Sequence, residues 1–242
     1  MNGRKLKRFF PALFLVLLSC GAAAAQGDRG VAQELIARGN ERYARGEYEA
    51  AIAVYARVRA DAGEAYAQAL YNIGVCRFEL WQTEAAVSLY AKAVEARAGR
   101  YPKAAYALGV ALEALGRTAE AKEAYARAVA GPGEGYAPAH YKLGMLAAGA
   151  GDDERAASHF REAIKRSKDK FPASHNNLGV MLARAGRLAE AEREFEAALR
   201  HSDGSFTEAA HNLKLCRALL AGRSKDGAVA MKVAEGPDGF SR

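Results

Sequence analysis

The chain has 242 residues, 50% of them hydrophobic, and 35 Lys and Arg against 28 Asp and Glu give it a net charge of +7. This length allows one sizeable core, and an alanine-rich composition without long β-branched runs favours helices. No basic patch with interleaved aromatic residues is present, so the charge does not indicate a nucleic-acid partner.

Residues 1–25 have the pattern of a secretory signal peptide: a basic start, an apolar run over 9–18 and small residues after it. The apolar run is too short to serve comfortably as a membrane-spanning helix. The basic residues of this segment are Arg4, Lys5, Lys7 and Arg8. Without them 31 basic and 28 acidic residues remain, a net charge of +3, so most of the basicity belongs to the predicted export signal.

Two cleavage sites compete in this segment. Leu17-Leu18-Ser19-Cys20 resembles a bacterial lipobox, which would make Cys20 the lipidated first residue of the mature protein. The alternative is an A-x-A site ending at Ala25, which would release a protein starting at Gln26. An uncleaved anchor is the third and least favoured interpretation.

After a short polar lead over 26–31, the pattern predicts five pairs of helices joined by tight turns. The first pair is expected over about 32–45 and 48–59, and the second over about 67–96, with Trp81 where the other turns have glycine. Later pairs begin at Pro102, at Ala137-Pro138 and at Pro172, where proline suits the first helical turn. A lone helix over 207–221 is predicted to cap the last pair, and the aperiodic remainder, 222–242, to be a flexible tail.

Four columns of residues recur at an interval of 35 along these pairs. They are Gly39, Gly74, Gly109, Gly144 and Gly179; Ala51, Ala86, Ala121, Ala156 and Ala191; Tyr55, Tyr90, Tyr125, Phe160 and Phe195; and Tyr66, Tyr101, Tyr136, Phe171 and Phe206. An exact period of this length predicts a helical repeat array, because one hairpin cannot bury its apolar face alone. The glycine column predicts helices packed almost against the backbone.

The pattern resembles the tetratricopeptide repeat (TPR) family over about 32–221, as in Leu108-Gly109, Gly116, Ala121, Tyr125 and Ala128. The resemblance implies an all-α fold, a right-handed solenoid of five hairpins plus a C-terminal capping helix. Each unit exceeds by one residue the usual length of about 34. The family's proline after the second helix is replaced by Gly63, Ala98, Gly133, Lys168 and Asp203. We interpret the extra residue and the second aromatic column as another way to anchor the loop.

By the same resemblance, the first helices line a concave groove that receives a partner segment. The fifth repeat position holds Ile36, Tyr71, Tyr106, Tyr141, Asn176 and His211, and the ninth holds Asn40, Val75, Val110, Met145, Val180 and Leu215. Tyrosines beside an aliphatic ladder predict an apolar groove with hydrogen-bond donors, which suits peptide recognition. Asn72 and Lys103 are further candidates for this groove. The alternative is that these side chains pack against each other and bind nothing.

Some family members capture a peptide's C-terminal carboxylate with a clamp of Lys, Asn, Asn, Lys and Arg. The matching positions here hold Ile36, Asn40, Asn72, Lys103 and Ala107, so a cation is missing at each end. The sequence therefore disfavours carboxylate capture.

Two other pairs of residues invite a chemical interpretation. His140 and His175 stand 35 residues apart, but no Cys, Asp or Glu shares a column with them, so structural histidines are expected rather than metal ligands. Cys76 and Cys216 share a repeat position four units apart, which predicts two buried free thiols.

Nothing in the sequence indicates catalysis or a cofactor. Asp152, Asp153 and Glu154 open a helix, where acidic residues complement the helix dipole. We therefore expect a non-enzymatic scaffold or assembly factor of the bacterial cell envelope that binds a protein or peptide segment. The alternatives are a small-ligand-binding or transporter-associated periplasmic component, and a pilotin-like outer-membrane lipoprotein that requires lipid on Cys20.

Overall fold

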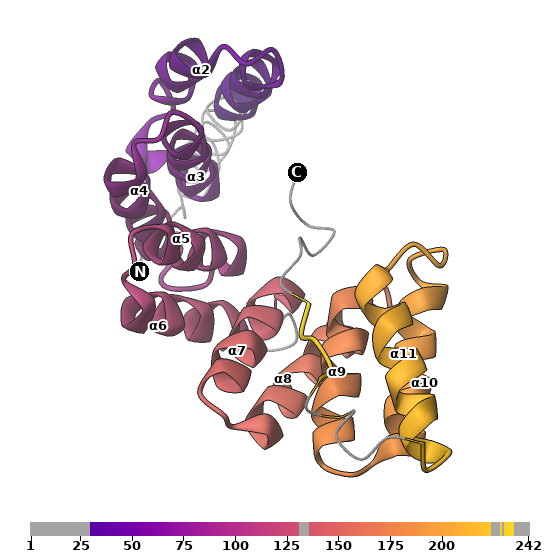
Figure 1. Cartoon of the computed structure of the whole chain (residues 1–242). Helices are drawn as coiled ribbons and strands as arrows, with labels where there is room; N and C mark the ends of the chain where they lie inside the picture. Colours follow the sequence, from indigo (N-terminus) through magenta and orange to yellow (C-terminus); the bar gives the residue numbers. More distant parts are fainter. Residues whose placement is uncertain (1–29, 131–135, 224–227, 229, 235–242) are drawn as a thin grey trace, which may run out of the picture. The chain divides into compact units, whose positions relative to one another are not determined.

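The computed structural model describes residues 30–130, 136–223, 228 and 230–234 (Figure 1). In these ranges the protein is built from helices and contains no strand. It divides into two compact units, residues 1–97 and 98–242. The predicted signal peptide, with Cys20, lies outside the described residues.

The first unit contains two helix hairpins. A helix over residues 30–44 is followed by α2 (Tyr48–Tyr55), the short 3-10 helix η1 (Ala60–Ala62), α3 (Glu64–Glu79) and α4 (Thr83–Ala96). Helix α2 ends at Tyr55, four residues before the end expected from the sequence, and α3 begins three residues early. The core of this unit is formed by residues of the helix over 30–44, α2 and α3, with Tyr55 and Cys76 buried in it.

The second unit contains three hairpins and a last helix. Its helices are α5 (Pro102–Ala114), α6 (Thr118–Val129), α7 (Ala137–Gly149), α8 (Asp153–Arg166), α9 (Pro172–Arg184), α10 (Leu188–Arg200) and α11 (Thr207–Leu220). Helix α11 packs against α10 and α9, as a capping helix should. Pro102 and Pro172 occupy the first positions of their helices, and Asp152 caps α8 by accepting a hydrogen bond from the backbone N–H of Arg155 at 3.0 Å.

The loops that lack the family's proline have a backbone that proline cannot adopt. Ala98, Lys168 and Asp203 have φ angles of 49°, 55° and 50°, whereas the proline ring holds φ near −65°. Each is followed by a second residue with positive φ, for example Gly99 at 79°. The aromatic column closes these loops, since Phe171 is buried and its ring lies 5.1 Å from that of Tyr141. The two successive residues with positive φ in these loops thus account both for the extra residue of each repeat and for the missing proline.

The turn inside each hairpin also needs a left-handed residue, and one hairpin does not use glycine there. Gly116 and Gly186 have φ angles of 74° and 76°, and Trp81 has 60° at the equivalent position. The Trp81 side chain is 91% exposed, so little packing compensates for this conformation. A side chain in the left-handed region costs about 1–2 kcal/mol.

Replacing Trp81 by glycine is therefore expected to stabilise the protein. Glycine removes the backbone strain, but it also has more freedom in the unfolded chain, which offsets part of the effect. The free energy of unfolding should therefore rise by roughly 0.5–1 kcal/mol. Urea denaturation of the variant measures this gain, and Gly116→Ala, at the same place in another hairpin, should lose a similar amount. A Trp81→Gly protein less stable than the wild type would show that the indole ring makes a stabilising contact.

The glycine column lets the two helices of a hairpin touch. A Cβ atom built on Gly144 of α7 would lie 2.6 Å from Cε1 of Phe160 in α8, and one on Gly179 of α9 would lie equally close to Phe195 in α10. Real Cβ atoms do not approach other carbons so closely, so only glycine admits these rings. The aromatic column thus packs on the glycine column of its own hairpin.

Candidate functional site

A short C-terminal segment of the second unit lies against helices α7, α9 and α11. Residues 231–234 have no regular secondary structure, and in Figure 1 this yellow segment runs over α9. Met231 and Ala234 are only 4% and 2% exposed and belong to the hydrophobic core of the unit. This part of the segment expected to be a flexible tail is therefore packed, and its partners are in α7, α9 and α11.

Ala234 is bound through its backbone on both sides. Its N–H donates to Oδ1 of Asn177 at 2.8 Å, and its carbonyl oxygen accepts from Nδ2 of the same side chain at 3.2 Å. The hydroxyl of Tyr141 donates to the same carbonyl at 2.7 Å. One asparagine thus pairs with both polar groups of one residue, as a neighbouring strand would.

The same arrangement recurs two residues earlier. The N–H of Lys232 donates to Oδ1 of Asn212 at 3.0 Å, and its carbonyl oxygen accepts from Nδ2 of Asn212 at 2.8 Å. Nδ2 of Asn176 donates to this carbonyl as well, at 3.3 Å. The side chain of Lys232 is exposed, so the protein contacts this residue through its backbone.

The asparagines also bind one another. Nδ2 of Asn176 donates to Oδ1 of Asn177 at 3.0 Å, and Nδ2 of Asn212 donates to Oδ1 of Asn176 at 2.9 Å. All three side chains are fully buried, where an amide without partners would be costly. We call Tyr141, Asn176, Asn177 and Asn212 the asparagine site. Because its bonds to the segment go to backbone atoms, it is suited to hold an extended polypeptide by its main chain.

Three of the residues predicted for a groove lie at this site. Tyr141 and Asn176 belong to it, and the sulfur of Met145 accepts a hydrogen bond from Asn177 at 3.2 Å. Val180 is buried in the core of the unit, while His211 is exposed on α11.

Three other predicted residues of the second unit lie on α5. The ring of Tyr106 is half-buried, 5.7 Å from Tyr125 and 5.1 Å from Tyr136. Val110 is half-buried and Lys103 exposed. A role of these three residues in binding stays a prediction.

The first unit holds Asn40, Tyr71, Asn72 and Val75 of the predicted groove. The ring of Tyr71 lies 5.7 Å from that of Tyr90 and is tilted against it by 39°, and Val75 is half-buried. Oδ1 of Asn40 accepts from the Tyr55 hydroxyl at 2.7 Å and from Nδ2 of Asn72 at 3.2 Å. These two asparagines thus bind within the unit, and Ile36, at the first clamp position, is buried.

Sequence reasoning missed Asn177 and Asn212 as a pair. They belong to a further column with the interval of 35, which also contains Asn72. That column was considered only as part of a carboxylate clamp. A comparison of the sixth repeat positions would have found two successive asparagines, but nothing in an aperiodic tail indicates the segment they hold.

The histidines of α7 and α9 have separate structural partners. Nδ1 of His140 lies 3.3 Å from Nδ1 of His159, and Nδ1 of His175 lies 2.8 Å from a carboxylate oxygen of Glu194. Burial, reinforced by His159, lowers the pKa of His140 to about 4, and burial also lowers the pKa of His159. Glu162 opposes both shifts, and the guanidinium groups of the neighbouring arginines add to them.

The pair formed by His140 and His159 is expected to make the protein less stable in mild acid. Since folding holds His140 neutral, its contribution is constant above pH 6.5 and is lost progressively toward pH 4, as the unfolded chain takes up the proton first. The loss from pH 7 to pH 5 should be on the order of 1–2 kcal/mol. Thermal melts of His140→Gln should show a smaller decline than the wild type over this range. The exposed His211, changed to Gln, should leave the decline intact, and an equal decline in all three proteins would exclude this explanation.

The two described cysteines are buried free thiols, as predicted. Burial raises the pKa of Cys76 to about 11 and also raises that of Cys216. Both thiols are therefore unreactive at neutral pH. Within the described ranges no group of three His, Cys, Asp or Glu side chains is arranged to hold a metal ion. No described helix is both long and apolar enough to cross a membrane.

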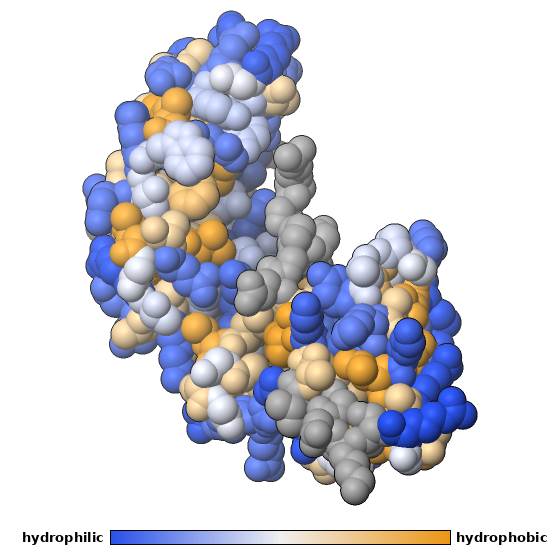
Figure 2. Space-filling model, in the orientation of Figure 1, coloured by the Kyte–Doolittle hydropathy of each residue, from blue (hydrophilic) through white to orange (hydrophobic). Residues whose placement is uncertain are grey.

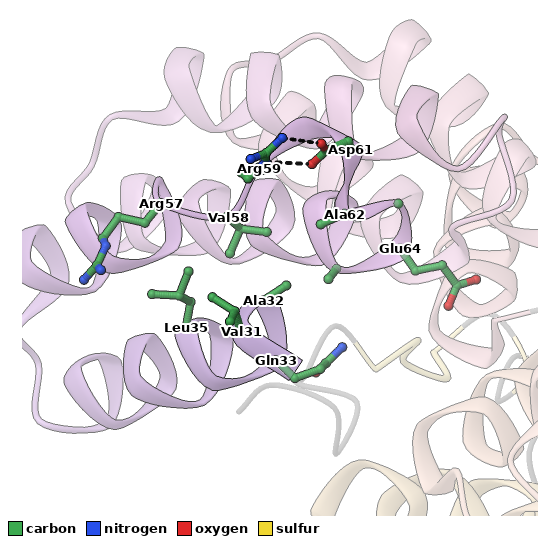
Figure 3. A pocket seen from close by; sticks show the side chains of 12 residues that line it. Val31, Ala32, Gln33, Leu35, Arg57, Val58, Arg59, Asp61, Ala62 and Glu64 are labelled. Atoms are coloured by element: carbon green, nitrogen blue, oxygen red, sulfur yellow. Dashed lines mark hydrogen bonds and ion pairs between the residues drawn. The ribbon is translucent and has the colours of Figure 1, made fainter. Parts of the chain in front are cut away.

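A separate hollow opens in the first unit, between the helix over 30–44 and the loop before α3 (Figure 3). It has a volume of about 760 Å³ and is lined by apolar side chains such as Leu35 and Val58 and by polar ones, among them the paired Arg59 and Asp61. Elsewhere, the face shown in Figure 2 has hydrophobic side chains scattered among hydrophilic ones over both units.

Comparison with solved structures finds the same fold in several proteins. A structure of PilF from Pseudomonas aeruginosa is 17% identical, with a TM-score of 0.65, over 85% of this chain and 90% of that one. A structure of MamA is 23% identical, with a TM-score of 0.55, over 72% and 92%. YrrB, described as a TPR protein with an unusual peptide-binding site, is 22% identical, with a TM-score of 0.54, over 69% and 87%.

No curated protein matches the chain. The profile of the tetratricopeptide repeat family matches residues 36–101, 82–136 and 141–206, which together make up more than half of the chain. The matched ranges cover hairpins of both units, and the predicted all-α repeat fold is confirmed. The chain belongs to the tetratricopeptide repeat family.

Proposed function

We propose that this protein is a non-enzymatic interaction module whose asparagine site binds an extended segment of a partner protein. The observation that carries the proposal is the pairing of Asn177 and Asn212 with both backbone groups of Ala234 and Lys232. These bonds are made two residues apart, at Lys232 and Ala234, so the site holds the main chain of the segment at two successive points.

The class of ligand follows from this chemistry. A site that pairs with N–H and C=O groups needs a polypeptide and does not need a charged terminus. YrrB, which has a similar fold, is described as having a peptide-binding site, and this supports a peptide ligand here. A small ligand would leave several of the buried amide groups unpaired, which opposes the alternative of a small-ligand carrier.

The test is a titration with a peptide in trans. The double variant Met231→Asp/Ala234→Asp, which we call the released chain, should lose its own segment because two carboxylates would be buried against the core. A fluorescent peptide of residues 228–234, blocked at both ends, should bind the released chain with saturable anisotropy. Absence of binding to a released chain that keeps its helical circular dichroism would contradict the proposal.

We also propose, from the pattern of residues 1–25, that the protein is exported and acts as a scaffold or assembly factor in the bacterial envelope. Lipidation of Cys20 would tether it to a membrane, as the pilotin-like interpretation requires. Intact mass and membrane fractionation of the wild type and Cys20→Ala distinguish the cases. A membrane-bound wild type with an added lipid mass, lost in the variant, supports the tether. Identical soluble proteins that start at Gln26 exclude it.

A further inference from the structure

The occupant of the asparagine site is part of the same chain, and this inference rests on the function proposed above. Helix α11 ends at Leu220, and residues 231–234 return to contact α7, α9 and α11. The polar contacts use backbone atoms of Lys232 and Ala234, which any polypeptide offers. A partner segment must therefore compete with a segment that is already attached.

The side chains of this segment show what the site accepts in addition to the backbone. Met231 and Ala234 are buried in the core of the unit, Val233 is half-buried, and the Lys232 side chain is exposed. Ala234 lies where Tyr141 and Asn177 both contact its backbone, and it is 2% exposed. The position of Ala234 thus has room for a small residue, and that of Met231 for a flexible apolar one.

We propose that residues 231–234 are a tethered pseudoligand of the asparagine site, and that the partner is an extended segment with the same pattern. In that pattern an unbranched apolar residue stands at the place of Met231 and a residue with a solvated side chain at the place of Lys232. A small residue stands at the place of Ala234. The pseudoligand keeps the site closed to segments that bind weakly. Only a segment that matches the pattern and is presented at high local concentration replaces it.

The strength of this competition follows from the tether. Ten residues, 221–230, join α11 to the bound segment, and a tether of this length gives an effective concentration on the order of 1 mM. If the free peptide binds the open site with a dissociation constant of about 10 μM, the attached copy weakens its apparent binding roughly 100-fold. If the attached segment occupies the site ten times less well than this, the apparent affinity of the free peptide still differs about tenfold between the wild type and the open site.

The experiment compares the full-length wild type with the released chain, using the same blocked peptide of residues 228–234. We expect the released chain to bind it at least tenfold more tightly than the wild type. A peptide carrying Ala234→Trp should bind the released chain at least tenfold more weakly, while Lys232→Glu, at the exposed side chain, should bind unchanged. A chain ending at Arg223 serves as a second released form if the aspartates disturb the fold.

Each outcome decides between the two proposals. Equal affinity of the wild type and both released forms would overturn the pseudoligand and leave the peptide site standing. Equal binding of the Ala234→Trp peptide would overturn the selection of a small residue. Failure of both folded released forms to bind any peptide would overturn the proposed function itself. A wild type that is dimeric in solution, and monomeric when released, would assign the segment to a second copy and overturn the tethered arrangement.

Discussion

Gly144→Ala is expected to destabilise the protein by about 3 kcal/mol, although alanine is the better helix former by about 1 kcal/mol. The new Cβ would meet Cε1 of Phe160 at 2.6 Å, and Phe160 is fully buried and cannot move aside. Helices α7 and α8 would have to separate, which breaks the packing of the hairpin. Thermal denaturation should show a fall of roughly 6–12 °C. Gly144→Leu should prevent the second unit from folding.

The same substitution elsewhere in α7 provides the control. Gly149 ends this helix, and a Cβ there would meet nothing within 4 Å, so Gly149→Ala should leave the stability unchanged or slightly higher. Replacing the ring by a smaller side chain, with Phe160→Leu, should restore part of the stability lost in the Gly144→Ala protein. A double-mutant cycle measures this coupling. If Gly144→Ala and Gly149→Ala melted alike, the close packing of glycine on ring would be disproved.

Asn177→Ala in the released chain is expected to weaken binding of the 228–234 peptide at least tenfold. The substitution leaves the buried N–H of Ala234 without a partner, which costs about 1–3 kcal/mol, whereas the carbonyl keeps its bond from Tyr141 and loses one hydrogen bond of about 0.5–1.5 kcal/mol. Together these losses come to at least about 1.5 kcal/mol, and each 1.4 kcal/mol is a factor of ten. Fluorescence anisotropy with the labelled peptide measures the change.

Asn72→Ala is the matched control, since Asn72 stands in the same repeat column but in the first unit. Its amide binds Asn40 and has no described contact with residues 231–234, so the affinity should stay as in the released chain. Circular dichroism must show both variants folded. Equal losses from Asn72→Ala and Asn177→Ala would mean that the peptide binds elsewhere.

The repeat architecture could be predicted from the sequence because its cause is local and repeated. Each glycine of α7 or α9 that meets a ring sits 16 residues before it, in the same hairpin, so one period contains the whole contact. The proline-free loops, and the aromatic column as their anchor, could be recognised from the sequence, but the backbone conformation of these loops could not. Their positive φ angles at Ala98 and Lys168 result from how successive helices are connected, which composition does not reveal.

The candidate site could be predicted only in part. Tyr141, Met145 and Asn176 were found because they recur at positions that the family uses for binding. Asn177 was missed because its role depends on the backbone of a segment more than fifty residues away. That segment forms no helix and has no period, so only the folded structure shows what Met231 and Ala234 contact.

Amide hydrogen exchange at Lys232 and Ala234, read residue by residue by NMR, tests the central claim most directly. Both N–H groups donate to buried asparagine oxygens, so in the full chain they should exchange at least 100-fold more slowly than in an unstructured peptide. Asn177→Ala should release the amide of Ala234 while the helices stay protected. Exchange of both amides at the rate of an unstructured peptide, in a chain whose helices are protected, would contradict the account.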